Sequence, residues 1–96
     1  MASLEELAAK AQKEAYPLQM GGAVLAMVAH PSLGQWSQAW EALQAASTTD
    51  EIPAFLVALG VDPAAAQAVG DNVAVMPVGT AGLLLDDMRR AFGLKN

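Results

Sequence analysis

A single histidine, His30, is the only side chain of a type that changes charge near neutral pH, and the chain has no cysteine. A catalytic triad would need a nucleophile and an orienting carboxylate beside this imidazole. Ser32 is close in sequence, but its place just before an apolar periodic segment predicts a helix N-cap. The lack of cysteine excludes disulfides, cysteine-ligated zinc and thiol catalysis. We therefore expect His30 to lie at a helix terminus, and we expect no enzyme activity, no metal site and no cofactor.

Four charged residues lie close together near the carboxyl end of the chain. Asp86 precedes Arg89 and Arg90 by three and four residues, and Asp87 precedes Arg90 by three. Side chains at these spacings are neighbours on a helix, where each opposite-charge pair contributes a few tenths of a kcal/mol. The pattern predicts a solvated ion-pair face, with a surface docking patch for a protein as the alternative.

Basic residues are distributed unevenly in a chain whose net charge is −5. The five Lys and Arg residues lie towards the two ends, with none between Lys13 and Arg89. Binding to phosphates or anionic lipids needs several cations along one face, so we expect no nucleic-acid partner and no membrane partner. The acidic N-terminus lacks the basic region of a secretory signal, and the apolar run from Met20 to Ala29 has about half the length of a bilayer span. We expect a cytoplasmic protein.

Alanine dominates the apolar composition and indicates the fold class. Hydrophobic residues make up 54% of the 96 residues, and 21 of them are alanine, the best helix former. The length predicts one domain, residues 1–96. We expect an all-α fold, a compact bundle of five or six short helices, with one extended segment near residues 73–78. Charged residues make up only 16% of the chain. A surface with so few charges favours self-association or a permanent binding partner.

Capping residues and breakers predict where the helices begin and end. Ser3 and Glu6 form a capping-box pattern, and Leu4 and Leu7 begin an apolar stripe. Proline and glycine separate the later helices, and Thr80 and Gly93 bracket the last one. The expected helices span residues 4–15, 17–29, 33–46, about 52 to Gly60, 63–69 ending at Gly70, and 81–92.

The segment 17–29 has apolar residues on every side, so as a helix it would be buried all round. Gly21 and Gly22 would each cost such a helix about 1 kcal/mol relative to alanine, and a kink or break at this pair is the alternative. The small residues Gly22, Ala26 and Ala29 share one helical face. They form a candidate interface at which another backbone could approach closely.

Trp36 and Trp40 lie one helical turn apart on a stripe that Leu33 and Leu43 continue. This pattern favours two core tryptophans beneath the helix. The alternative is an aromatic anchor at a protein interface, where tryptophan is over-represented.

These patterns favour a small non-enzymatic protein–protein interaction module that acts by occupying a surface, as an adaptor, inhibitor, immunity factor or assembly chaperone does. Its partner would be another protein, and a homo-oligomer is expected, with a dimer favoured. One alternative is an apolar-ligand binding domain with a pocket between helices lined by Met20, Met27, Trp36 and Trp40. A second alternative is an enzyme subunit whose chemistry lies on another chain.

Overall fold

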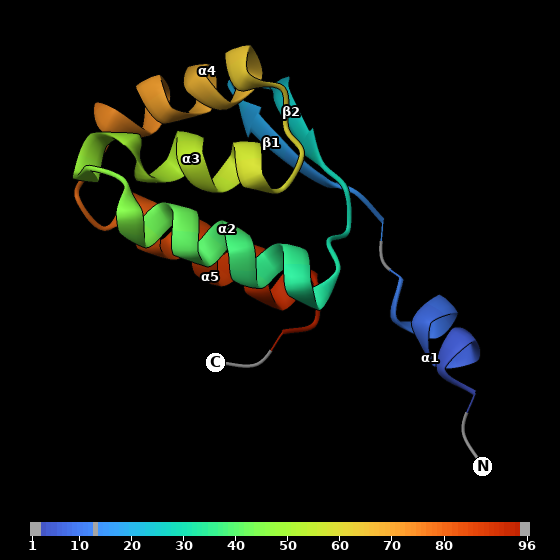
Figure 1. The fold of residues 1–96 in the computed structure, drawn as a ribbon. Helices are drawn as coiled ribbons and strands as arrows, with labels where there is room; N and C mark the ends of the chain where they lie inside the picture. Colours follow the sequence, from blue (N-terminus) through green and yellow to red (C-terminus); the bar gives the residue numbers. More distant parts are fainter. Residues whose placement is uncertain (1–2, 13, 95–96) are drawn as a thin grey trace.

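A computed structural model describes residues 3–12 and 14–94, and it shows helices together with a β-hairpin (Figure 1). The expectation of an all-α fold is corrected: the chain is mostly helical but contains a two-stranded antiparallel sheet. The elements, in chain order, are α1 (Leu4–Ala11), β1 (Tyr16–Met20), β2 (Ala23–Val28), α2 (Leu33–Ala45), the 3₁₀ turn η1 (Thr48–Asp50), α3 (Glu51–Ala58), α4 (Pro63–Ala74) and α5 (Thr80–Ala91).

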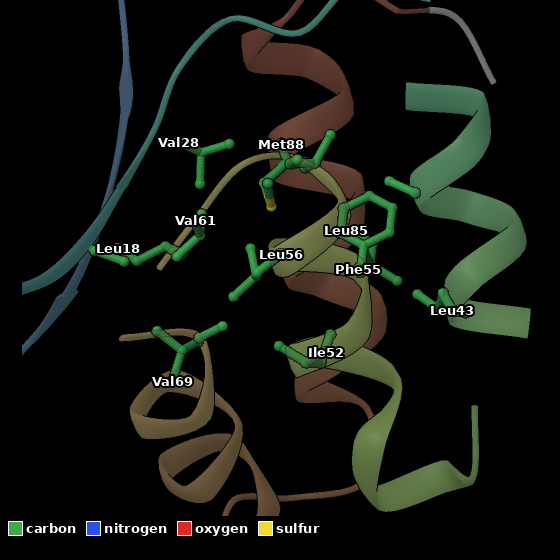
Figure 2. Packing of buried hydrophobic residues seen from close by; sticks show 14 of the residues in the cluster. Leu18, Val28, Leu43, Ile52, Phe55, Leu56, Val61, Val69, Leu85 and Met88 are labelled. Atoms are coloured by element: carbon green, nitrogen blue, oxygen red, sulfur yellow. The ribbon is translucent and has the colours of Figure 1, made fainter. Parts of the chain in front are cut away.

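Helix α3 lies at the centre of the core. It packs against α2 and against α4, and α4 in turn packs against β2. Figure 2 shows Ile52, Phe55 and Leu56 of α3 among side chains from α2, α4, α5 and the strands. Phe55 is fully buried and Leu56 is 1% exposed. The helix that is covered on almost every side is therefore α3, and not the segment 17–29.

The segment 17–29 is not a helix, and this overturns the prediction for it. β1 and β2 pair antiparallel, with Met20 opposite Ala23 across the turn. Gly21 and Gly22 have φ values of 59° and 84°, the left-handed region that both central residues of a type I′ turn require. The break at this glycine pair, which the sequence left open, is the arrangement found. A helix would have carried the cost of both glycines, whereas the turn uses their conformational freedom.

The candidate interface of small residues is corrected with the helix that defined it. Gly22 lies in the turn, Ala26 is buried at 7% exposure, and Ala29 is exposed after the end of β2. The three residues share no face, because only Ala26 lies within a strand. Ala26 lies on the buried side of the hairpin together with Leu18 and Val28.

Helix α4 is longer than predicted. The sequence indicated a helix over 63–69, a turn at Gly70 and an extended segment at 73–78, but α4 continues through Ala74. Its start is confirmed, because the Asp62 carboxylate accepts the Ala64 N–H at 3.0 Å. Gly70 is needed for close packing rather than for a turn: a Cβ atom there would lie 2.4 Å from Cγ of Pro53 in α3.

Local signals predicted the boundaries of α2, α3 and α5 well. The Ser32 hydroxyl accepts the Gln35 N–H at 3.1 Å and caps α2. Gly60 and Gly93 have φ values of 94° and 77°, as expected after a helix end. Thr80 is the first residue of α5, and Gly79 occupies the cap position without a side-chain bond.

Helix α1 projects away from the core (Figure 1), and its last residue, Ala11, borders a cavity beside His30. It begins as predicted, since Ser3 accepts the Glu6 N–H at 3.4 Å, but it ends at Ala11 rather than near residue 15. Within the described residues, no helix is both long enough and apolar enough to cross a membrane.

The contact between Gly70 and Pro53 can be tested with a matched pair of glycine substitutions. Gly70→Ala is expected to lower the free energy of unfolding by about 1–3 kcal/mol, because the added methyl group overlaps a buried proline ring. Gly82→Ala in α5 meets no atom within 4 Å and is expected to be neutral or stabilising by up to about 1 kcal/mol. Urea denaturation of both variants measures the difference, and equal effects would refute the role assigned to Gly70.

Candidate functional site

Helix α1 presents an apolar face that the other described residues leave largely exposed, although Ala11 at its end lines the cavity beside His30. None of its residues is buried, and Leu4 and Leu7 are 79% and 48% exposed. With Ala8 and Ala11 they occupy positions i, i+3, i+4 and i+7, the spacing by which a helix anchors itself in a groove of another protein. Isolated helices shorter than about 12–15 residues are marginal in water. An eight-residue helix of this kind therefore needs a covering surface to be stable.

Polar residues on the other side of α1 suit a helix that stays in contact with water. Glu5 and Glu6 lie in its first turn and Lys10 in its last, the arrangement that the helix dipole favours. The Ser3 hydroxyl donates a hydrogen bond of 2.9 Å to the Glu5 carboxylate, and this bond is the main cause of the lowered pKa of Glu5. The helix is thus amphipathic, with its polar side satisfied in solvent and its apolar side uncovered.

Other exposed apolar side chains lie outside such a stripe. Val75 and Val78 are 86% and 101% exposed in the connection between α4 and α5, and Leu33 is 75% exposed at the first residue of α2. Single exposed apolar residues are common on soluble proteins. These scattered residues are therefore weaker evidence for a binding surface than the regular apolar stripe on α1.

The two tryptophans both pack towards the core. Trp36 is 9% exposed, and its ring meets Phe55 and Phe92 edge-on at centroid distances of 5.1 and 6.1 Å. Trp40 is half-buried, packs edge-on against Phe55, and has the Arg89 guanidinium 5.5 Å from its ring centroid. The stripe read from the sequence thus belongs mainly to the core beneath α2.

The charged residues of α5 are largely engaged in contacts within the chain. Asp86 and Arg89 form an ion pair at 3.3 Å, as their spacing predicts. Asp87 accepts a short hydrogen bond from the Tyr16 hydroxyl at the start of β1. Arg90 is exposed. The predicted docking patch therefore consists of residues that mostly hold α5 to α2 and to the hairpin.

Tyr16 is the residue whose ionisation the fold changes most clearly. Burial, followed by the hydrogen bond and the negative charge of Asp87, raises the pKa of Tyr16 from 10.0 to about 12. The Tyr16 ring also meets Phe92 edge-on at 6.1 Å. These contacts fasten the first residue of the hairpin to α5, and their role is structural.

His30 lies beside a cavity of about 190 Å³ whose wall includes Trp36 and Phe92. Its ring meets Phe92 edge-on at 5.2 Å, and its Nδ1 atom is buried without a hydrogen-bond partner. The Ser32 hydroxyl accepts the Gln35 N–H as the cap of α2, and it donates no hydrogen bond to the unpartnered Nδ1 of His30. In the described part of the chain, no three His, Asp or Glu side chains converge as metal ligands.

The residues expected to line one ligand pocket are separated. Met20 borders an apolar cavity of about 150 Å³ between the hairpin, α4 and α5, whereas Trp36 borders the cavity at His30. Met27 is 54% exposed on β2.

Sequence reasoning missed the exposed apolar side chains of the hairpin. Val24 and Met27 on β2 are 52% and 54% exposed, and Met20 at the turn is 44% exposed. The signal was available, since a Gly-Gly pair between two apolar runs is typical of a two-residue hairpin turn. The lack of strict alternation concealed it: the register shifts between Leu18 and Gln19, and this bulge disturbs the period of two.

Comparison of the chain with models of protein families, with curated proteins and with solved structures finds no match.

The lone tyrosine allows a direct test of the contact between Tyr16 and Asp87. Ultraviolet absorbance of the phenolate should titrate with a midpoint near pH 12 in the folded protein. Asp87→Asn is expected to lower this pKa towards 10, though not fully, because the burial remains. Asp86→Asn is the control and should leave the midpoint unchanged, since Asp86 pairs with Arg89. Equal midpoints for Asp87→Asn and the unchanged protein would contradict the assignment.

The same pKa shift predicts how stability depends on pH. The folded state keeps the Tyr16 proton to a higher pH than the unfolded state does, so the unfolded state is the first to lose it. This contribution to stability is fully present below pH 10 and is lost as the pH rises towards 12. Tyr16→Phe should remove the dependence in this window.

Proposed function

We propose that the protein is a non-enzymatic interaction module that binds another protein through the apolar face of α1. The observation that carries the proposal is that Leu4 and Leu7 form the apolar side of a regular helix and remain 79% and 48% exposed. The remaining helices and the hairpin build a core that contains no residue of α1.

The energetics favour docking of α1 on a protein surface. Full burial of a leucine side chain contributes about 1.5–3 kcal/mol, and two leucines one turn apart can enter one groove together. Part of this gain is spent on ordering the short helix, since a segment that folds on binding loses conformational entropy at that step. Affinity would therefore be moderate and binding reversible, as suits an adaptor or a regulatory inhibitor.

The apolar cavity beneath the hairpin supports a second candidate function, the binding of a small apolar molecule. Its volume is about 150 Å³, and Leu18, Leu25 and Leu84 belong to its wall. Apolar cavities of about this size accept molecules such as benzene. A melting temperature that rises with benzene concentration would support this candidate, and an unchanged melting temperature would dismiss it.

Site-specific photo-crosslinking tests the docking role of α1 in the native host. A photoreactive amino acid at position 7 is expected to give covalent adducts with a partner protein. The same amino acid at position 9, on the opposite side of the helix, is expected to give few. Leu4→Ser with Leu7→Ser should abolish capture of that partner, and Ala9→Ser should preserve it. Equal adducts from positions 7 and 9, or unchanged capture by the double variant, would refute the proposal.

Stability measurements separate a docking role from a structural role. Because α1 buries none of its residues, Leu4→Ser and Leu7→Ser should each change the free energy of unfolding by no more than about 0.5 kcal/mol. The contrasting substitution Phe55→Ala, in the core, should cost about 3–5 kcal/mol. A loss of comparable size from either serine variant would show that α1 supports the fold instead.

A further inference from the structure

Three uncharged side chains that can form hydrogen bonds border the apolar cavity beneath the hairpin. Gln19 lies in β1, Asn72 in the last turn of α4 and Thr80 at the first residue of α5. These positions are far apart in sequence, and the fold brings them to the wall of one cavity. Ligand sites in proteins combine apolar walls with a few polar groups that orient the ligand. The composition of this wall is therefore typical of a site for a molecule that is only partly apolar.

The hydrogen-bonding capacity of these three side chains is largely unused within the described part of the chain. Neither the Gln19 amide nor the Thr80 hydroxyl has a partner among the described residues. The amide nitrogen of Asn72 donates to the Ala68 C=O at 2.8 Å, and the amide oxygen remains an acceptor. The wall thus offers both donors and acceptors, which suits a ligand group that can also do both, such as a hydroxyl.

The wall of the cavity carries no charge among the described residues that form it. A carboxylate entering the cavity would lose water without meeting a cation, and an ammonium group would meet no carboxylate. Burial of an unpaired charge is strongly unfavourable. The net charge of −5 on the chain also disfavours an anionic ligand. The part of a ligand that enters the cavity is therefore expected to be uncharged.

The size of the cavity limits the apolar part of the ligand. Its volume is about 150 Å³, which is the size of an apolar cavity that holds benzene. An apolar body of about six carbons therefore fits. Methionine side chains are flexible and adapt to the shape of what they contact. The apolar residues of the wall include two of them, and the full apolar set is Leu18, Met20, Leu25, Val69, Val73, Met76 and Leu84.

We propose that this cavity binds an uncharged molecule with an apolar body of about six carbons and a single hydroxyl group. The apolar body lies against the leucine, valine and methionine side chains. The hydroxyl forms hydrogen bonds with side chains of the set Gln19, Asn72 and Thr80. This inference rests on the second candidate function, the binding of a small apolar molecule, and adds the chemical class of the ligand. It does not depend on the docking of α1.

Nuclear magnetic resonance of methionine methyl groups in the full chain tests the proposal, with 1-hexanol, benzene and hexanoate as probes. Met20 and Met76 border the cavity, whereas Met27 and Met88 do not and serve as internal controls. Hexanol should shift the signals of Met20 and Met76 in a saturable way and leave the other two unchanged. Hexanoate, which is ionised at pH 7, should bind at least about tenfold more weakly than hexanol.

The outcomes separate this inference from the candidate function beneath it. Equal binding of hexanol and hexanoate, or equal shifts of all four methionines, would overturn the proposed ligand class. Shifts of Met20 and Met76 with benzene but not with hexanol would also overturn it, while the binding of an apolar molecule would stand. No shift with any of the three probes would refute both.

Three shape-matched variants test whether the polar wall holds the hydroxyl. Gln19→Met, Asn72→Leu and Thr80→Val each remove one hydrogen-bonding group. At least one should lower the affinity for hexanol by about twofold to tenfold and leave that for benzene unchanged, because a hydrogen bond contributes a modest net free energy. Thr80→Ser keeps the hydroxyl and is the control for position 80, where the side chain does not cap α5. Unchanged affinity for hexanol in all three variants would overturn the proposal.

Discussion

The burial of α3 is the constraint on which the rest of the fold depends. This helix has only eight residues, too few to be stable alone, yet Phe55 and Leu56 are almost completely removed from water. α2 packs on one side of it and α4 on the other, while α5 and the hairpin complete the enclosure (Figure 2). The close approach of α4 is possible because residue 70 has no side chain where Pro53 passes. The positions of α2 and α4 are therefore set by α3.

A core that contains no residue of α1 leaves the apolar face of this helix exposed. The buried cluster runs from Leu18 to Phe92 and includes residues of every other helix and both strands. The contacts of Tyr16 with Asp87 and Phe92 hold the first residue of β1 in place, so the hairpin does not rely on the chain before it. Leu4 and Leu7 consequently resemble core residues in sequence but have no core to enter. The hairpin likewise buries one side, with Leu18 and Val28, and leaves Met27 half exposed on the other.

The parts of the fold that the sequence predicted are those set by local chemistry. Ser32 and Asp62 cap their helices, and Gly60 and Gly93 follow helix ends, because each needs only a few neighbouring residues to act. The failures involve distant contacts. Gly70 resembled a helix stop because its partner, Pro53, is far away in sequence. The hairpin was read as a helix because its apolar residues showed no clear period, and the bulge removed the alternation that identifies strands. The exposure of α1 was not predictable, since an amphipathic stripe has the same pattern whether the chain covers it or leaves it open.

Native-state amide hydrogen exchange of the full chain, resolved residue by residue, tests most directly whether the core closes without α1. The account predicts that the amides of Phe55 and Leu56 exchange only through global unfolding, because they belong to the central helix. The amides of α1 should exchange with almost no protection in the isolated protein, because the buried core contains no residue of that helix. Protection of α1 equal to that of α3 would contradict the account.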